Sequence, residues 1–234
     1  MPSLFLSGYI MKTFLTLACF ILTLGQLYGQ KKKCYCDKDS LMNNATVSCK
    51  TQILRNKSKL YWQYNCDKIW LTLENTKGQK VIIDEIPVGY YGYTYRLGFH
   101  LVKEFEKSIL FRSGCPANGP CNYTIIDKNT GKKLDEFRQL ICIDTHVTQE
   151  EKYQFDFIVY ADSTYKKIIV NYPDTKYVLT IPFDFQRNNL TARIPEFQFH
   201  NMKKNGNILT LFYTTTDDNK LDLKINLKNK KYSH

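Results

Sequence analysis

Short stretches of alternating apolar and polar residues constrain the fold of this chain more than any other feature. Alternation with a period of two is typical of a β-strand with one buried face, whereas an amphipathic helix repeats every 3.6 residues. No stretch shows sustained helical periodicity between capping residues. The pattern predicts strands over residues 59–64, 69–73, 80–84, 93–102, 108–112, 122–126, 132–137, 139–143, 153–160, 166–172, 176–181, 207–213 and 221–227.

Turn-forming residues separate these segments. Asn75 and Gly78 bound one turn, and Asp127 and Gly131 bound another, where glycine allows the left-handed backbone that a reversal needs. We therefore predict an all-β fold: an antiparallel β-sandwich or barrel of about ten to twelve short strands, in one unit or two halves. A fragment of a β-propeller ranks second, because the strand–turn–strand pattern recurs only faintly and about forty residues form a blade.

The N-terminal region has the pattern of a secretory signal. Lys12 precedes about a dozen apolar residues, and the small Gly29 follows before a polar stretch, so residues 1–29 are predicted to be a cleaved leader whose translation starts at Met11. The apolar run is shorter than the ~20 residues of a membrane span, which disfavours an uncleaved anchor. Lipidation at Cys19 is a lesser alternative. We expect a Cys-containing β-rich region over 30–144 and a second β-rich region over 145–234, which belongs either to the same domain or to another.

The leader that ends in Gly29-Gln30 and the Lys-, Asn- and Tyr-rich chain after it resemble secreted proteins of the Bacteroidetes. The resemblance covers only the leader and the composition. It implies an exported protein, periplasmic or secreted, that acts in a bacterial envelope or outside the cell.

The cysteines are predicted to form structural disulfides. Removing the leader takes away Cys19 and leaves seven of the eight cysteines, and an exported chain meets an oxidising compartment. They form two clusters, Cys34, Cys36, Cys49 and Cys66, and Cys115, Cys121 and Cys142. If the first segment is extended, Cys34 and Cys36 point to opposite sides and take different partners. Cys115 and Cys121 would close a proline-stiffened loop, and one thiol is left over.

Other uses of the cysteines are disfavoured by their spacing. Zinc sites favour two to four residues between paired cysteines, and redox centres favour Cys-x-x-Cys. Neither spacing occurs here, and no histidine lies close in sequence to the Cys34–Cys36 or the Cys115–Cys121 pair. We expect no metal and no cofactor.

No motif indicates catalysis. Nucleophile elbows, phosphate-binding loops and His-Glu-x-x-His are absent, and the four histidines are scattered. His100 is expected to be a packed, hydrogen-bonded residue of a strand. A Cys142–His146 dyad is a minor alternative. The adjacent acidic pairs, 84–85, 150–151 and 217–218, fall at strand ends or turns, which explains them without a function.

The basic charge is spread out as lysine doublets. Loss of Lys12 with the leader reduces the formal charge from +11 to +10. This charge favours an anionic glycan, an envelope component or an acidic protein as partner. Nucleic acid is disfavoured, because lysine dominates over arginine and the chain is exported.

A tyrosine-rich segment, residues 88–95, is the candidate contact surface. Tyr90, Tyr91, Tyr93 and Tyr95 share this eight-residue segment with two glycines and offer flat amphipathic side chains. The structural alternative is a glycine-kinked strand whose tyrosines pack at the rim of the core.

These observations lead to one hypothesis and one alternative. The hypothesis is an exported, non-catalytic binding or interaction protein, such as an inhibitor or immunity-type protein, with no transmembrane span after signal cleavage. The alternative is a polysaccharide-directed hydrolase with unidentified carboxylates, which would show converging carboxylates of raised pKa in a cleft.

Overall fold

The computed structural model describes residues 48–117, 119–141, 155–190, 195–229 and 231–233. All of them belong to one compact unit, Tyr35–His234. The predicted leader, the predicted boundary near residue 145, and Cys34, Cys36, Cys142 and His146 lie outside the described residues.

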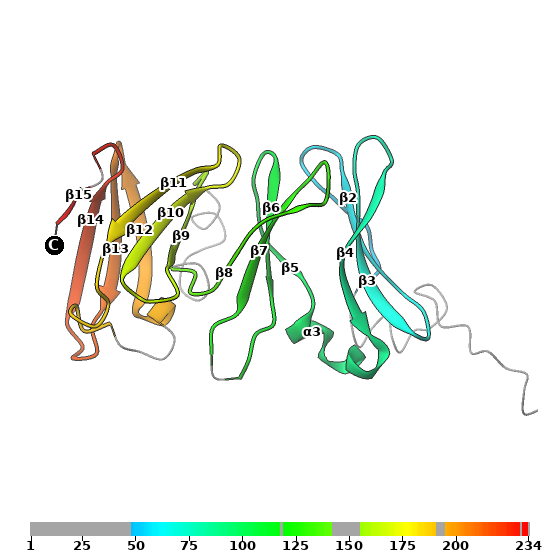
Figure 1. Cartoon of the computed structure of the whole chain (residues 1–234), viewed down its shortest axis with the longest axis horizontal. Coiled ribbons are helices and arrows are strands. Elements are labelled where there is room, and N and C mark those ends of the chain that lie inside the picture. Colours follow the sequence, from blue (N-terminus) through cyan, green and yellow to red (C-terminus); the bar gives the residue numbers. More distant parts are fainter. Residues whose placement is uncertain (1–47, 118, 142–154, 191–194, 230, 234) are drawn as a thin grey trace, which may run out of the picture. The chain divides into compact units, whose positions relative to one another are not determined.

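The described strands form four antiparallel sheets that follow one another along the chain (Figure 1). Sheet 1 contains β1 (Gln52–Ile53), β2 (Lys59–Tyr64), β3 (Lys68–Glu74) and β4 (Lys80–Pro87). Sheet 2 contains β5 (His100–Glu104), β6 (Ser108–Ser113), β7 (Asn122–Asp127) and β8 (Lys133–Phe137). Two short helices, η1 (Val88–Tyr93) and α3 (Thr94–Leu97), connect these sheets.

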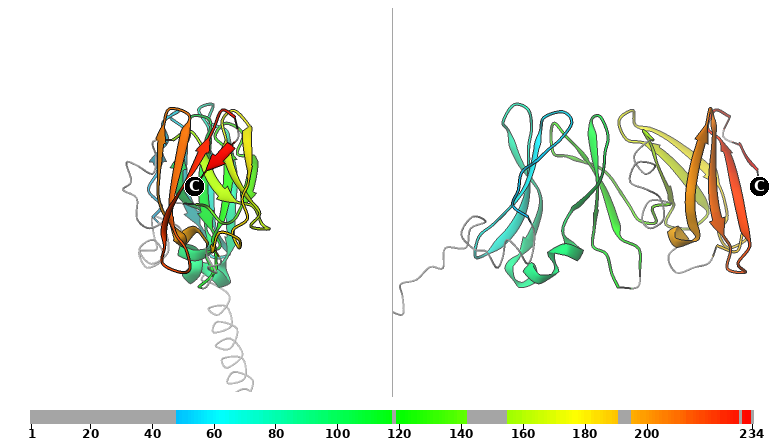
Figure 2. Two further views of the ribbon diagram at one scale, coloured as in Figure 1. Left: turned by 90° about the vertical axis from the view of Figure 1, so that its left-hand side faces the viewer. Right: turned by 180° about the vertical axis from the view of Figure 1, so that it is seen from behind.

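The second half of the described chain repeats this arrangement. Sheet 3 contains β9 (Ile158–Ala161), β10 (Lys167–Tyr172) and β11 (Tyr177–Pro182). After η2 (Pro195–Gln198), sheet 4 contains β12 (Phe199–Asn205), β13 (Ile208–Thr214), β14 (Lys220–Asn226) and β15 (Lys231–Ser233). The turned views of Figure 2 show the same succession of sheets, from cyan in sheet 1 to red at β15.

The predicted antiparallel all-β fold is confirmed. Each strand pairs with the strand next to it in sequence, so every sheet is a meander, the strand order found in the blades of β-propellers. The described residues contain fifteen strands rather than ten to twelve. The additional ones are β1, which has two residues, β12, and the three-residue β15.

Neighbouring sheets pack face to face, as the layers of a sandwich do. Leu71 of β3 shares a buried cluster with Phe111 of β6. On the other face of sheet 2, Leu110 shares a cluster with Ile158 of β9. A third cluster joins sheet 3 to sheet 4. Strands β6 and β9 are therefore apolar on both faces, whereas β14 buries alternate residues and keeps one wet face, as its alternation predicted.

Two predicted strands are wrong in part. The segment 93–102 begins with the helical residues of η1 and α3, and its strand starts only at His100. The tyrosine spacing imitated a strand, but the connection between two sheets has no strand beside it, so its backbone forms helical turns instead. Of segment 139–143, Leu140 makes one isolated bridge to Tyr160, and Gln139 has a left-handed φ of 60°.

The predicted hairpin over 122–137 is confirmed, and its turn is built from local hydrogen bonds. Asp127 Oδ1 accepts from the backbone N–H groups of Asn129 at 3.0 Å and Thr130 at 2.7 Å. Gly131 has a φ of 68°, and a Cβ there would lie 2.8 Å from Val81 of sheet 1. Only glycine satisfies both the backbone conformation and this contact.

A buried lysine in the same turn pairs with a glutamate of sheet 2 that also accepts a hydrogen bond from the β1–β2 connection of sheet 1. The Lys128 side chain is fully buried, and its Nζ lies 2.5 Å from Glu104 Oε1. Nζ also donates to the carbonyl oxygens of Phe105 and Glu106. Glu104 Oε1 accepts in addition from the backbone N–H of Arg55, 2.6 Å away. The pair is thus surrounded by complementary groups, which a buried charge requires.

Replacing Lys128 should destabilise the fold strongly. Lys128→Met removes the cation paired with Glu104 and the donor to two carbonyl oxygens, so we expect the free energy of unfolding to fall by about 3 kcal/mol. The exposed neighbour Lys132 provides the control, because Lys132→Met should change it by less than about 0.5 kcal/mol. Denaturant unfolding of the three proteins measures both changes. Equal stabilities of the two variants would contradict the assigned role of Lys128.

Candidate functional site

The predicted tyrosine segment exposes its side chains to solvent. Tyr90, Tyr93, Tyr95 and Leu97 are 54%, 55%, 58% and 42% exposed, and we call these four residues the tyrosine surface. The side chain of Tyr91 lies outside what the structure describes. The three described tyrosines are therefore available for contact and do not lie in the core.

Neighbouring elements hold the helical turns that carry the tyrosine surface. The backbone N–H of Cys115 donates to the Arg96 carbonyl at 3.1 Å, and His100 Nε2 lies 3.3 Å from the Thr94 carbonyl oxygen. The Arg96 guanidinium lies 5.6 Å from the centre of the Tyr95 ring. His100 is thus a half-buried, hydrogen-bonded residue, as the sequence predicted, and Arg96 adds positive charge beside the tyrosines.

The predicted disulfide loop is present. Cys115 and Cys121 form a disulfide, six residues apart in sequence. Cys49 and Cys66 are also disulfide-bonded. The pairing of the first cluster and the odd thiol remain predictions, because the other cysteines lie outside the described residues.

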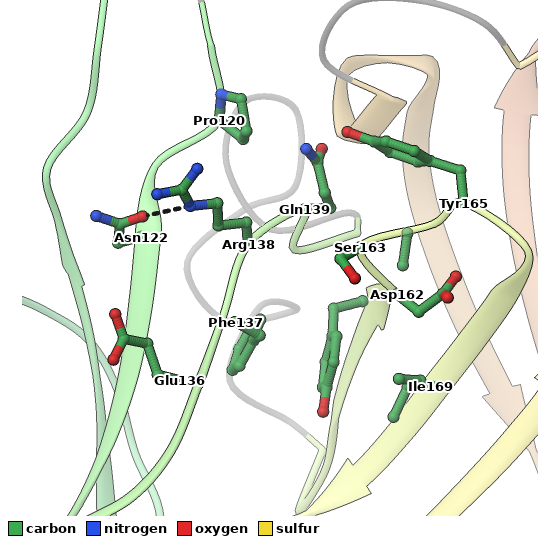
Figure 3. A pocket seen from close by; sticks show the side chains of 12 residues that line it. Pro120, Asn122, Glu136, Phe137, Arg138, Gln139, Asp162, Ser163, Tyr165 and Ile169 are labelled. Carbon is green, nitrogen blue, oxygen red and sulfur yellow. Dashed lines mark hydrogen bonds between the residues drawn. The ribbon is translucent and has the colours of Figure 1, made fainter.

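A pocket of about 800 Å³ lies where the end of β8 faces the β9–β10 turn (Figure 3), and we call it the β8–β9 pocket. Phe137, Arg138 and Gln139 line one side, and Asp162, Ser163 and Tyr165 line the other. Its volume lies within the range of small-molecule sites.

Stacked aromatic rings form the apolar wall of this pocket. The ring centres of Phe137 and Tyr160 lie 4.1 Å apart, and Phe137 also stacks on Tyr123 at 5.6 Å. Burial, with the nearby Asp135 carboxylate, raises the pKa of Tyr160 to about 12. The phenol therefore stays neutral at physiological pH and donates to Asp135 Oδ2 at 3.3 Å.

The polar side of the pocket combines a cation with a buried amide. Arg138 is exposed, and its Nε donates to Asn122 Oδ1 at 2.8 Å, as the dashed line in Figure 3 marks. Gln139 is only 6% exposed, and its Oε1 has no hydrogen-bond partner among the described residues. In Figure 3 the amide end of Gln139 lies between Arg138 and Tyr165.

The two carboxylates at the pocket are already engaged. Asp162 accepts from Thr164 and from the backbone N–H groups of Lys166 and Lys167, and the hydrogen bonds lower its pKa against the opposing effect of burial. Glu136 is paired with Lys133 at 2.6 Å. This arrangement differs from the converging carboxylates of raised pKa that a glycoside hydrolase uses.

A second, smaller cavity of about 280 Å³ contains Lys103, which is 3% exposed. Its Nζ donates to the carbonyl oxygen of Phe155 and lies 4.9 Å from the centre of the Phe105 ring. Burial lowers the pKa of Lys103 to about 8, with Asp156 acting in the opposite direction and Arg55 in the same direction.

Metal and membrane sites were sought within the described ranges. No group of three or more His, Cys, Asp or Glu side chains there is placed to hold a metal ion. The helices of that part of the chain are too short or too polar to cross a membrane.

Sequence reasoning predicted a contact role for the tyrosine segment, whose described tyrosines are exposed, but it missed the β8–β9 pocket. Its residues come from two strand ends that are separated in sequence, and Gln139 belonged to a segment predicted as a strand. The only available signal was the polar pair Arg138-Gln139 between apolar residues, which also fits a strand.

Lys103 should make the free energy of unfolding rise with pH in the alkaline range. Its pKa in the folded chain, about 8, is lower than its ordinary 10.5, so between these values the unfolded chain binds more protons and stability rises with pH. Relative to Lys103→Met, the wild-type chain should gain up to about 3 kcal/mol between pH 8 and 10.5. Unfolding of wild type, Lys103→Met and the exposed control Lys107→Met at each pH tests this. A constant difference between wild type and Lys103→Met would contradict it.

Comparisons with known proteins do not identify the chain. No family model and no curated protein matches it. It is similar to an uncharacterised protein, lmo1340, from Listeria monocytogenes EGD-e, with 10% identity, a TM-score of 0.29, and 80% of this chain and 67% of that one covered. It is also similar to TolB from Acinetobacter baumannii, with 13% identity, a TM-score of 0.25, and 76% of this chain and 40% of TolB covered. Likenesses with such low TM-scores carry no conclusion about this chain.

Proposed function

We propose that the chain is an exported, non-catalytic binding protein that contacts a protein partner through the tyrosine surface. One observation carries the proposal: Tyr90, Tyr93 and Tyr95 are each more than half exposed within six residues. Tyrosine adds contact area with little loss of side-chain entropy, and it is enriched at binding hot spots.

The surroundings of the tyrosines support a contact role. A Cβ placed on Gly89 or Gly92 would meet nothing within 4 Å, so the backbone between the rings is open to an approaching partner. Arg96, which lies beside Tyr95, belongs to a residue type that is also enriched at interfaces. The charge of +11, or +10 without the leader, would speed association with an acidic partner.

Two further features support export and binding over hydrolysis. Disulfides such as Cys115–Cys121 persist in oxidising compartments, which agrees with the predicted leader. The carboxylates at the larger pocket, Asp162 and Glu136, are engaged by the turn and by Lys133. The partner would then be an exported or envelope protein.

Removing the tyrosine rings should abolish partner retention while the fold is kept. The mature chain and its Tyr90→Ala/Tyr93→Ala/Tyr95→Ala variant are immobilised and exposed to envelope extract, and each retained protein and glycan is quantified. We expect the triple variant to retain the protein partner at least about tenfold less well, because truncated hot-spot residues each cost more than 1 kcal/mol.

The matched control replaces three exposed aromatic residues elsewhere, Tyr177, Phe197 and Tyr232, which are 45%, 56% and 43% exposed. This control triple variant should retain the partner as the wild type does. Equal loss in both triple variants would refute the assignment to the tyrosine surface. Retention of glycan alone, with release of shortened glycan, would favour the hydrolase.

A further inference from the structure

The β8–β9 pocket is lined by a residue whose buried amide oxygen accepts no hydrogen bond among the described residues. Gln139 is only 6% exposed, and its Oε1 accepts no hydrogen bond from any described residue. Native proteins rarely leave a buried acceptor unpaired, and such groups are found where a water or ligand completes the bonding. Gln139 lines the pocket, and although Oε1 itself is covered, a turn of the amide about its last side-chain torsion, which is only weakly restricted, would present the oxygen to a ligand donor.

The backbone on both sides of the pocket is held in an unfavourable conformation. Gln139 has a φ of 60° and Tyr165 a φ of 55°, although neither is glycine. The Gln139 carbonyl is fixed by the N–H of Ala161 at 3.0 Å, and Leu140 pairs with Tyr160. Strained residues that persist because their surroundings fix them are concentrated at functional sites.

Arg138 gives the pocket a cation fixed in direction. Its Nε is bonded to Asn122, and its terminal nitrogens make no hydrogen bond to any other residue in the described ranges. These two nitrogens can bind a carboxylate in parallel, which a lysine cannot do. Of the two carboxylates at the pocket, Glu136 is paired with Lys133, and Asp162 is bonded to two backbone N–H groups of its own turn.

The remaining groups suit a ligand with hydroxyl groups on an apolar frame. Ser163 lines the side opposite Gln139, and the aromatic side chains of Phe137 and Tyr165 face the same space (Figure 3). Hydroxyls would bond to the amide and to Ser163, while the carbon face of a sugar ring would contact the aromatic rings.

We propose that the β8–β9 pocket binds a sugar unit that carries a carboxylate. The carboxylate binds the terminal nitrogens of Arg138, and a hydroxyl donates to Gln139 Oε1. This site uses none of the residues of the tyrosine surface, so the proposal does not depend on whether the tyrosine surface binds a protein partner.

The test is calorimetric titration of the wild-type protein with three small molecules. D-glucuronate carries both the sugar and the carboxylate, D-glucose lacks the carboxylate, and cyclohexanecarboxylate lacks the hydroxyls. We expect D-glucuronate to bind at least about tenfold more tightly than either of the others. D-glucose cannot form the charge-assisted hydrogen bonds of the carboxylate, and cyclohexanecarboxylate cannot form the neutral hydrogen bonds of the hydroxyls.

Two variants test the assigned residues. Arg138→Gln removes the charge, and Gln139→Asn shortens the amide while asparagine tolerates the left-handed φ, so both should fold. Each should weaken D-glucuronate binding about tenfold or more, whereas Arg96→Gln, which removes the same charge at the tyrosine surface, should not. Thermal unfolding of every variant verifies that the fold is retained.

Several outcomes would overturn the proposal. Absence of D-glucuronate binding, or equal binding of D-glucose, would refute recognition of the carboxylate. Equal binding of cyclohexanecarboxylate would refute recognition of a sugar. Equal weakening by Arg96→Gln and Arg138→Gln would show that general positive charge, and not the pocket, attracts the ligand.

Discussion

Face-to-face packing of consecutive meanders is the constraint on which the rest of this structure depends. Sheets 2 and 3 are covered on both faces, so β6 and β9 present apolar side chains in both directions. Several polar links between sheets lie at turns and strand ends. Asp174 in the β10–β11 turn accepts from Ser108 Oγ at 2.7 Å, and Glu104, the last residue of β5, accepts from the backbone N–H of Arg55 at 2.6 Å. The pocket also lies at such a place, where β8 ends beside β9.

The sequence predicted those parts of the fold that local pattern controls. Strand β2 has the predicted bounds, and the hairpin from β7 to β8 was recognised from its turn residues. Strand β12 was missed because Lys203, Lys204 and Asn205 hide its alternation, although Met202 on the same strand is buried. The helical turns before His100 were missed because tyrosine spacing imitates a strand. Whether such a segment forms a strand depends on the strand that pairs with it, and a single sequence does not show which segments pair.

The candidate sites differ in the same way. The contact segment was predicted because Tyr90, Tyr91, Tyr93 and Tyr95 lie within six residues of one another. The β8–β9 pocket was not found, because its parts, Arg138 and Tyr165, come together only through the pairing of Leu140 with Tyr160. Lys128, within the predicted turn 127–131, is fully buried against Glu104, which its place in a turn does not indicate. Long-range packing, and not residue type, gives these side chains their roles.

The same packing explains how the pocket keeps an unfavourable backbone. Behind its aromatic wall, Asp135 Oδ2 accepts from Asn171 Nδ2 at 2.9 Å and from the Tyr160 hydroxyl, which ties β8 to sheet 3. Strand β9 is buried at all four positions and cannot shift without opening two clusters. Gln139 is bonded to this strand through its own carbonyl, so the left-handed turn is held by the core on which it rests. A side chain held in this way is directed before any ligand arrives, which reduces the entropy lost on binding.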